Sequence, residues 1–319
     1  MSPALRLLAQ RIALGLLLLF LVSILIFAGT IILPGDVAQS ILGQSATEQS
    51  LANLREELGL NEPVLQRYFN WLGAALQGDL GTALTSGQEI APILGSRLKN
   101  TLFLAFWAAI ISVPLAIFLG LLAVRYRDRW PDKLISAVTL ASISVPEFLI
   151  AYVLMFFIGV KFRLFQPTAI GFRPDADLFS KLESIALPVA VLTLVVLAHM
   201  MRMTRAAILN VMQSAYIETA ELKGLSMFNI IWRHAFPNSI APVVNVVMLN
   251  LAYLVVGVVV IEVVFVFPGM GQYLVDHVSK RDVPVVQACG LVFAAVYIGL
   301  NMVADVVAIL SNPRLRHPK

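Results

Sequence analysis

Three acidic side chains lie inside apolar stretches of the sequence, where they are the groups best placed to do chemistry: Glu147, Glu262 and Asp305. A carboxylate in an apolar segment is costly unless it faces a cavity or a partner, so such residues often mark transport paths or structural pairs. Glu147 directly follows Pro146, and helix breaks of this kind often line transport paths. The alternative is a protonated or paired carboxyl. We expect Asp305 to pair with Asn301, one helical turn earlier.

Enzymatic chemistry finds no support in the motifs. The sequence has no G-x-x-x-x-G-K-[ST] phosphate loop and no H-E-x-x-H pattern, and its Gly-x-Ser matches at Gly43 and Gly224 fall in predicted loops. The histidines are too scattered for a metal cluster, at His199, His234, His277 and His317. We therefore predict no catalytic residue, no metal and no enzyme, and any ATP must be hydrolysed elsewhere.

The composition predicts a polytopic membrane protein made of helices. Of 319 residues, 59% are hydrophobic and 13% charged, whereas a soluble domain is about 25% charged. The mean hydropathy is +0.85. The apolar run after Arg6 and Arg11 resembles a signal peptide, but it is long enough to be a retained first span. Cys289 is the single cysteine, so no intrachain disulfide can form.

Six stretches are long and apolar enough to cross a bilayer, which needs about 20 residues per helix. They are Ile12–Leu33, Thr101–Val124, Leu134–Val160, Ala186–Met201, Val243–Phe267 and Val285–Leu310. Basic residues near the span ends favour the cytoplasmic side, and most lie on the side of both termini: Arg6, Arg11, Arg125, Arg127, Arg129, Lys133, Arg202, Arg205, Lys223, Arg233, Arg314, Arg316 and Lys319. Lys161 and Arg163 oppose this trend. We predict that both termini are cytoplasmic.

The spans divide the chain into three parts. Residues 1–34 form the tail and first span, 35–100 an extracytoplasmic loop domain, and 101–319 a core of five spans with a cytoplasmic loop at about 205–240. The 35–100 part contains a helical pattern that Ser45 or Thr47 could cap and Gly59 could end. We expect it to be an ordered cap.

The cytoplasmic loop carries a helix, a glycine turn and a second helix in YIETAELKGLSMFNIIWRHAFPNSIAP, residues 216–242. Gly224 suits a helix C-terminus, because φ is often positive there and glycine adopts such a conformation freely. Pattern alone predicts an amphipathic surface hairpin.

This loop resembles the EAA loop of binding-protein-dependent ABC importer permeases. Glu218, Thr219 and Ala220 stand at the Glu-Ala-Ala positions, with Gly224 at the family glycine and Pro237 at the family proline. His-Ala-hydrophobe before the proline is similar to the dipeptide/oligopeptide/nickel branch. Further similar stretches are ILPGD at 32–36, LGLNEPVLQRYFNWLGAALQGDLGTAL at 58–84, RMTRAAIL at 202–209, VFPGMGQYLVDHVSKRDVPVVQ at 266–287 and NPRLR at 312–316.

The resemblance implies the type I ABC importer permease fold in a bacterial inner membrane, and it implies partners. These would be a second homologous permease, two ATP-binding subunits that hold ATP and Mg, and an extracytoplasmic solute-binding protein, with no nucleic acid. The loop would form a coupling helix that docks on an ATPase. The residues assigned to this contact are Glu218, Thr219, Ala220, Glu221, Lys223, Gly224 and Leu225.

The resemblance also places Glu262 in an E-x-V-F-x-x-P-G motif near the outer end of the fifth span. Pro268, Gly269 and Gly271 form the outer loop motif. Glu262 is either an anchor of this loop or, with Pro146 and Glu147, a candidate for the translocation path.

The predicted function is passage of short peptides or related small solutes, driven by a separate ATPase. Nickel chelates, opines and glutathione are alternatives, because the same branch carries them. A secondary transporter is an alternative of another class, but it would need no docking loop and would often show inverted repeats, which the sequence lacks.

Overall fold

The computed structural model describes residues 3–32, 37–43, 46–57 and 59–311. The described chain is helical, and its β pairing is limited to an isolated bridge between Thr82 and Glu89. The ILPGD stretch beyond Ile32, the NPRLR ending and the cap candidate Ser45 lie outside the described residues.

Among the described residues, five helical stretches are long and apolar enough to span a membrane, and a sharply bent pair makes a sixth when it is counted as one span. The helices are α1 (Pro3–Ile32), α5 (Ile90–Arg125), α9 (Ala186–Met212), α12 (Phe236–Val264) and α14 (Val283–Ser311), with α6 (Trp130–Ser144) and α7 (Glu147–Leu154) as the bent pair. A π-helical turn, Met155–Lys161, continues α7. The all-α polytopic fold is therefore confirmed.

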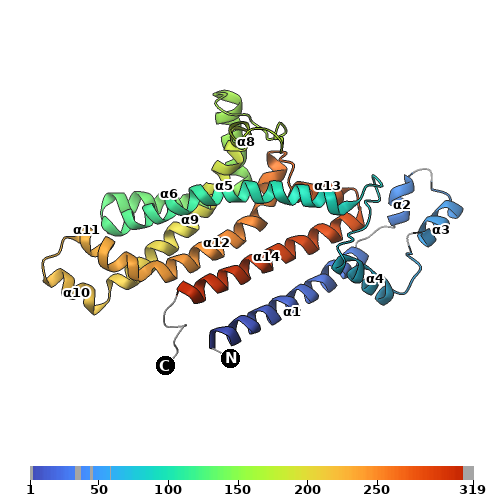
Figure 1. The fold of residues 1–319 in the computed structure, drawn as a ribbon. Coiled ribbons are helices and arrows are strands. Elements are labelled where there is room, and N and C mark those ends of the chain that lie inside the picture. The colour runs from blue at the N-terminus through green and yellow to red at the C-terminus, as the bar shows by residue number, and fades with distance from the viewer. Residues whose placement is uncertain (1–2, 33–36, 44–45, 58, 312–319) are drawn as a thin grey trace.

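The long helices run side by side, most of the shorter elements lie at their two ends, and α8 (Leu178–Ser184) projects from the side between them (Figure 1). At one end lie α10 (Ala215–Leu222) and α11 (Met227–Asn229), and at the other α2 (Val37–Leu42), α3 (Glu48–Glu57) and α4 (Val64–Leu76). Helix α1 begins, and α14 ends, toward the α10 end. The structure thus places both ends of the described chain on the side of the predicted coupling loop; which side is cytoplasmic stays a prediction.

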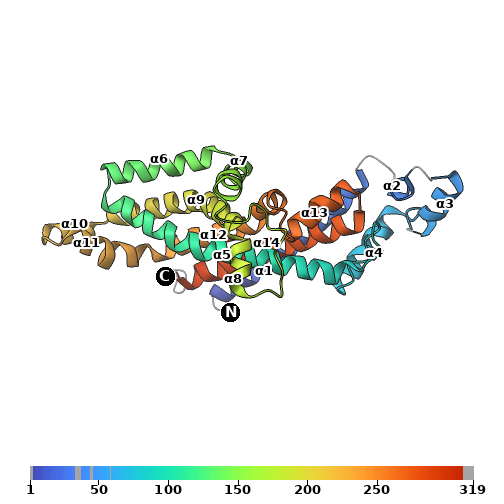
Figure 2. The same cartoon turned by 90° about the horizontal axis from the view of Figure 1, so that it is seen from above.

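Helices α5 and α9 form the most extensive helix pair, and α12 joins them in the main core. Close approach is possible because Gly120 has no side chain: a Cβ there would lie 3.0 Å from Thr204 Cγ2. Helix α6 lies alongside α9, and α7 leaves the direction of α6 at a sharp bend while still contacting α9 (Figure 2). Helix α1 packs on α14, where Gln287 Nε2 donates to Thr30 Oγ1 at 2.8 Å.

The 35–100 segment is folded where it is described. Thr47 caps α3, since the backbone N–H of Ser50 donates to its Oγ1 at 3.2 Å. The helix ends at Glu57, and Gly59, with φ +63, lies just beyond it. Both features were predicted. Tyr68 of α4 is buried and shares a 2.8 Å hydrogen bond with Ser23 of α1, so this segment packs on the membrane helices.

Two predictions about the spans need correction. The stretch Leu134–Val160 is two helices bent by 103° at a break. Asp305 pairs with Arg11 Nη1 at 3.2 Å, while the Asn301 amide donates to the Tyr297 carbonyl oxygen. Tail arginines were treated as topology signals alone, so this partner was missed.

Candidate functional site

The predicted coupling loop is a helical hairpin closed by a glycine. Helix α10 ends with two hydrogen bonds of a Schellman motif: Leu225 N–H donates to Ala220 O at 3.3 Å, and Gly224 N–H to Glu221 O at 2.9 Å. Gly224 has φ +73, as predicted. A Cβ there would meet nothing within 4 Å, so backbone conformation, not space, requires the glycine.

Helix α10 has one face on the protein and one face outward. Ile217 and Ala220 are buried in a cluster with residues of α5, α9 and the π-helical turn Ile230–Ala235. The Leu222 side chain is 82% exposed. Six of the seven assigned contact residues are exposed: Glu218, Thr219, Glu221, Lys223, Gly224 and Leu225. Ala220 faces inward, so its role is to pack α10 against the rest of the protein.

The second half of the hairpin is tied back to the first. Ser226 caps α11 by accepting from Asn229 N–H at 3.4 Å. Tyr216 OH donates to the His234 carbonyl oxygen at 3.4 Å, and the Asn238 amide donates to the same oxygen at 2.7 Å. Pro237 is the second residue of α12, which continues the π-helical turn without a break, so its missing N–H removes one backbone donor from the helix.

The bent span places Glu147 at a helix start. Val145 and Pro146 are extended, with ψ 129 and 137; for Val145 the cause is the following proline, whose ring disfavours helical backbone in the residue before it. Pro146 is exposed and Glu147 is half-buried. Within the described residues, no hydrogen bond or ion pair reaches the Glu147 carboxylate.

An apolar groove lies near this bent span. Its volume is about 570 Å³, and its walls come from α5, α7, α8 (Leu178–Ser184) and α9. Two of its lining residues carry buried polar atoms without a hydrogen-bond partner, Trp107 Nε1 and Thr193 Oγ1. Thr193 is 6% exposed. The groove therefore combines apolar walls with two unused polar atoms.

Glu262 anchors the outer turn. It is 0% exposed, and it accepts from Thr101 Oγ1 at 2.6 Å and from the backbone N–H groups of Gly271 and Gln272 at 2.7 and 3.2 Å. A side chain at Gly269 would collide with this carboxylate. These contacts lie wholly within the chain, so they fit the anchoring alternative and not a path-lining role.

The rest of the outer loop motif is held by α5. The Asn100 amide donates to the Pro268 carbonyl oxygen at 2.8 Å, and Met270 N–H donates to Thr101 Oγ1 at 2.8 Å. A Cβ on Gly271 would lie 2.7 Å from Val259 Cα. Both glycines of the motif therefore serve close packing between α12 and α13 (Met270–Ser279).

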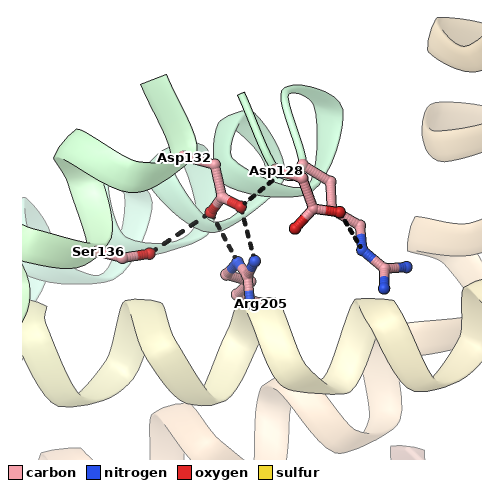
Figure 3. Close-up of polar contacts among 5 residues, drawn as sticks. Asp128, Asp132, Ser136 and Arg205 are labelled. Atoms are coloured by element: carbon pink, nitrogen blue, oxygen red, sulfur yellow. Dashed lines mark hydrogen bonds and ion pairs between the residues drawn. The ribbon is translucent and has the colours of Figure 1, made fainter. Parts of the chain in front are cut away.

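Sequence reasoning missed a buried ion pair that holds α6 to α9. Asp132 is 4% exposed, and its carboxylate accepts hydrogen bonds from Arg205 Nε at 2.9 Å and from Arg205 Nη2 at 2.7 Å. Figure 3 shows this carboxylate between Arg205, Ser136 and the backbone N–H of Asp128. Arg205 was counted only as a topology signal, although an acidic residue in the first turn of a helix opposite an arginine-bearing helix could have suggested the pair.

Comparison with known proteins places the chain in a family. The model of the binding-protein-dependent transport system inner membrane component matches residues 112–317, and that of its N-terminal membrane component matches residues 4–118. A probable peptide ABC transporter permease of Sinorhizobium fredii is 32% identical over 97% of this chain and 98% of its own. The glutathione transport system permease GsiC of Escherichia coli K12 is 35% identical over 94% of this chain and 95% of its own.

A solved structure of the methionine ABC transporter MetNI, in inward-facing conformations, covers 70% of this chain and 96% of its own, with 16% identity and a TM-score of 0.48. The family matches define a membrane-spanning permease subunit. The chain belongs to the binding-protein-dependent ABC transporter permeases. It is a multi-pass inner membrane protein, and the resemblance in its sequence is confirmed.

Proposed function

We propose that this chain forms part of the pathway of an ATP-driven importer and that residues 216–226 receive the drive from a separate ATPase subunit. The observation that carries this proposal is the two-faced α10 hairpin. Its outward face is exposed at one end of the long helices, and its inward face is buried on three of the elements it would have to move.

The packing of the hairpin allows a displacement of α10 to be transmitted to the membrane helices. Ile217 and Ala220 share one buried cluster with Leu121 of α5, Ile208 of α9 and Ile231 of the π-helical turn. Packed interiors have few voids and transmit displacement. If the ATPase subunit holds α10 and displaces it, α5, α9 and α12 should therefore move together with α10.

The bent span supplies the candidate path. Glu147 is half-buried without a partner among the described residues, and a carboxylate facing lipid would cost about 2.5–3.5 kcal/mol at mid-depth. A second homologous permease facing α7 would remove that cost and complete the path. Glu147 and Pro146 remain path candidates, while the contacts of Glu262 favour an anchoring role.

Short peptides or related small solutes are the proposed cargo. This rests on the relatives whose names specify peptide and glutathione transport. Nickel chelates and opines are alternatives within the branch. The proposed partners are a second homologous permease, two ATP-binding subunits with bound ATP and Mg, and an extracytoplasmic solute-binding protein.

Cysteine cross-linking tests the coupling contact. In a chain with Cys289 replaced, single cysteines at Glu218 and Leu222 should cross-link to the ATPase subunit, whereas one at Ala220 should not, because it is buried. A cysteine at Ser50, in α3, is the control at the opposite end. Cross-linking equal at Ser50 and Leu222, or absent from both outward positions, would contradict the assignment.

Orientation and energy source need separate tests. A cysteine at Gln88 should react with an impermeant reagent added outside cells, and one at Ser226 should not; the reverse would overturn the orientation. Uptake should depend on ATP. Uptake driven by an ion gradient without ATP would instead support a secondary transporter.

A further inference from the structure

A basic cavity lies where the coupling hairpin meets the α5–α6 turn, residues 126–129. Its volume is about 470 Å³. The walls come from the end of α5, the turn, the end of α9 and both arms of the hairpin: Val124, Arg125, Tyr126, Arg127, Arg129, Leu209, Met212, Gln213, Glu221 and Met227. The coupling assignment above uses one of these lining residues, Glu221, and none of the arginines.

The charges of the cavity are not balanced. Three arginines line it against one acid, Glu221. Arg127 pairs with Asp128 at 3.4 Å, whereas Arg125 and Arg129 form no ion pair within the described residues. The Arg125 guanidinium instead lies over the rings of Tyr126 and Phe228, at 5.8 and 5.9 Å from their centroids.

Glu221, which lines the cavity, offsets at most one of these two guanidinium charges, and the acids of the α5–α6 turn and of the start of α6 are engaged elsewhere. Asp132, at the start of α6, is committed to the bidentate contact with Arg205. Asp128 is taken by Arg127. The cavity therefore keeps a positive charge that suits an anion from outside the chain.

Its position relative to the membrane indicates the source of that anion. Trp130 follows Arg129 directly and is 74% exposed, and tryptophans gather at the level of lipid headgroups. Beyond it, α6 presents Leu134 and Val138, both exposed, as expected of a face beside acyl chains. The cavity thus opens where a headgroup would lie, with an apolar helix next to it.

We propose that this cavity binds the phosphate of an anionic phospholipid headgroup, which joins the α5–α6 turn to the coupling hairpin. Guanidinium groups bind phosphate through paired, charge-assisted hydrogen bonds, and basic pockets between membrane helices bind anionic headgroups. A partner carboxylate would satisfy the arginines equally, but it would leave the exposed Trp130 and α6 face without a role. The effect on coupling rests on the proposed function of α10; the binding does not.

The test uses the full chain without ATPase subunits. Retention of phosphatidylglycerol, against phosphatidylcholine, is measured by native mass spectrometry for wild type and for Arg125→Gln/Arg129→Gln. The matched control is Arg202→Gln/Arg233→Gln, which removes two exposed charges outside the cavity. We expect the cavity variant to lose about thirtyfold in phosphatidylglycerol affinity, about fivefold for each basic side chain, and the control to change little.

Each outcome decides something. Equal retention by the two double variants would overturn the lipid site. Displacement of phosphatidylglycerol by millimolar inorganic phosphate would show that free phosphate is the ligand and would also overturn it. If the cavity variant kept its lipid but lost the ATPase subunit in the assembled complex, the arginines would bind a protein carboxylate and the proposal would be wrong. A failure of coupling alone would leave the lipid result intact, so the two proposals are separable.

Discussion

Replacing Gly224 with valine should uncouple the chain from its ATPase through backbone strain alone. Gly224 holds φ +73, and its position allows a Cβ without any contact within 4 Å. An L-residue in this region costs about 1–2 kcal/mol, and a β-branched residue costs more because its side chain crowds the backbone. One or two kcal/mol changes a conformational ratio by a factor of about 5–30.

That strain would act on the two hydrogen bonds that close the hairpin. If Gly224 leaves positive φ, the N–H of Leu225 loses its bond to Ala220 O, and α10 loses its fixed angle to α11. The spans are not touched, so insertion and pairing with a second permease should persist. Substrate-stimulated ATP hydrolysis and uptake should fall together, by about fivefold or more.

A substitution series separates strain from bulk. Asparagine tolerates positive φ and should retain most coupling at position 224, alanine should lie between, and valine should be worst. If bulk against the ATPase were the cause, asparagine would be as harmful as valine. Gly87→Val is the matched control, because Gly87 has φ +67 and equally open surroundings but lies in the 35–100 segment.

The assay is ATP hydrolysis and solute uptake by purified complexes in proteoliposomes, with bound ATPase subunit measured in the same preparation. Full coupled transport by Gly224→Val, with the subunit retained, would refute the reasoning. So would an equal loss from Gly87→Val, since that residue lies outside the coupling hairpin, just before the start of α5.

Three further predictions concern the acidic residues. Glu147→Gln should alter uptake in proteoliposomes while thermal stability and assembly stay close to wild type, and unchanged uptake across several substrates would remove its transport role. Glu262→Ala should lower the unfolding temperature strongly, because it strands three buried donors at about 1–3 kcal/mol each; a wild-type melting curve would contradict the anchor. Arg205→Ala should destabilise by about 3–5 kcal/mol because it strands the buried Asp132, and the Asp132→Ala/Arg205→Ala double variant should recover part of this; additive losses would argue against the pair.

Hydropathy predicted the spans because lipid imposes one rule on every segment: its backbone must be satisfied internally. It could not predict where helices continue into water. Helix α5 begins at Ile90, well before Thr101, and α9 runs on to Met212, past Met201. Their extensions carry polar residues that no longer match an apolar window but keep helical hydrogen bonds.

Local rules predicted the turns well. Gly224, Gly59 and the Thr47 cap were all found from residue types whose backbone preferences are strong. The effect of Pro146 was only half anticipated: its position suggested a break, but the third span was drawn as one helix. A proline signals which residue leaves the helix, while the 103° bend depends on packing that the sequence does not express.

Pairs distant in sequence were beyond local rules. Asp282 accepts from the backbone N–H groups of Leu84 and Thr85 at 3.1 and 2.9 Å, and Arg11 meets Asp305. Such partners meet only once the helices have packed. Asp305 was therefore assigned to its neighbour in sequence, Asn301, because spacing along a helix was the information at hand.

The coupling hairpin and the bent span are joined by two contacts, and this connection gives the proposed mechanism its physical route. Ile217 of α10 packs in one cluster with Ile208 of α9. One turn before Ile208, Arg205 forms an ion pair with Asp132 at the start of α6. Helix α6 then runs to the break before Glu147. We infer that a displacement of α10 reaches the bend through α9 and this ion pair, since α6 is one continuous helix from Trp130 to Ser144 and the extended residues Val145 and Pro146 separate it from α7.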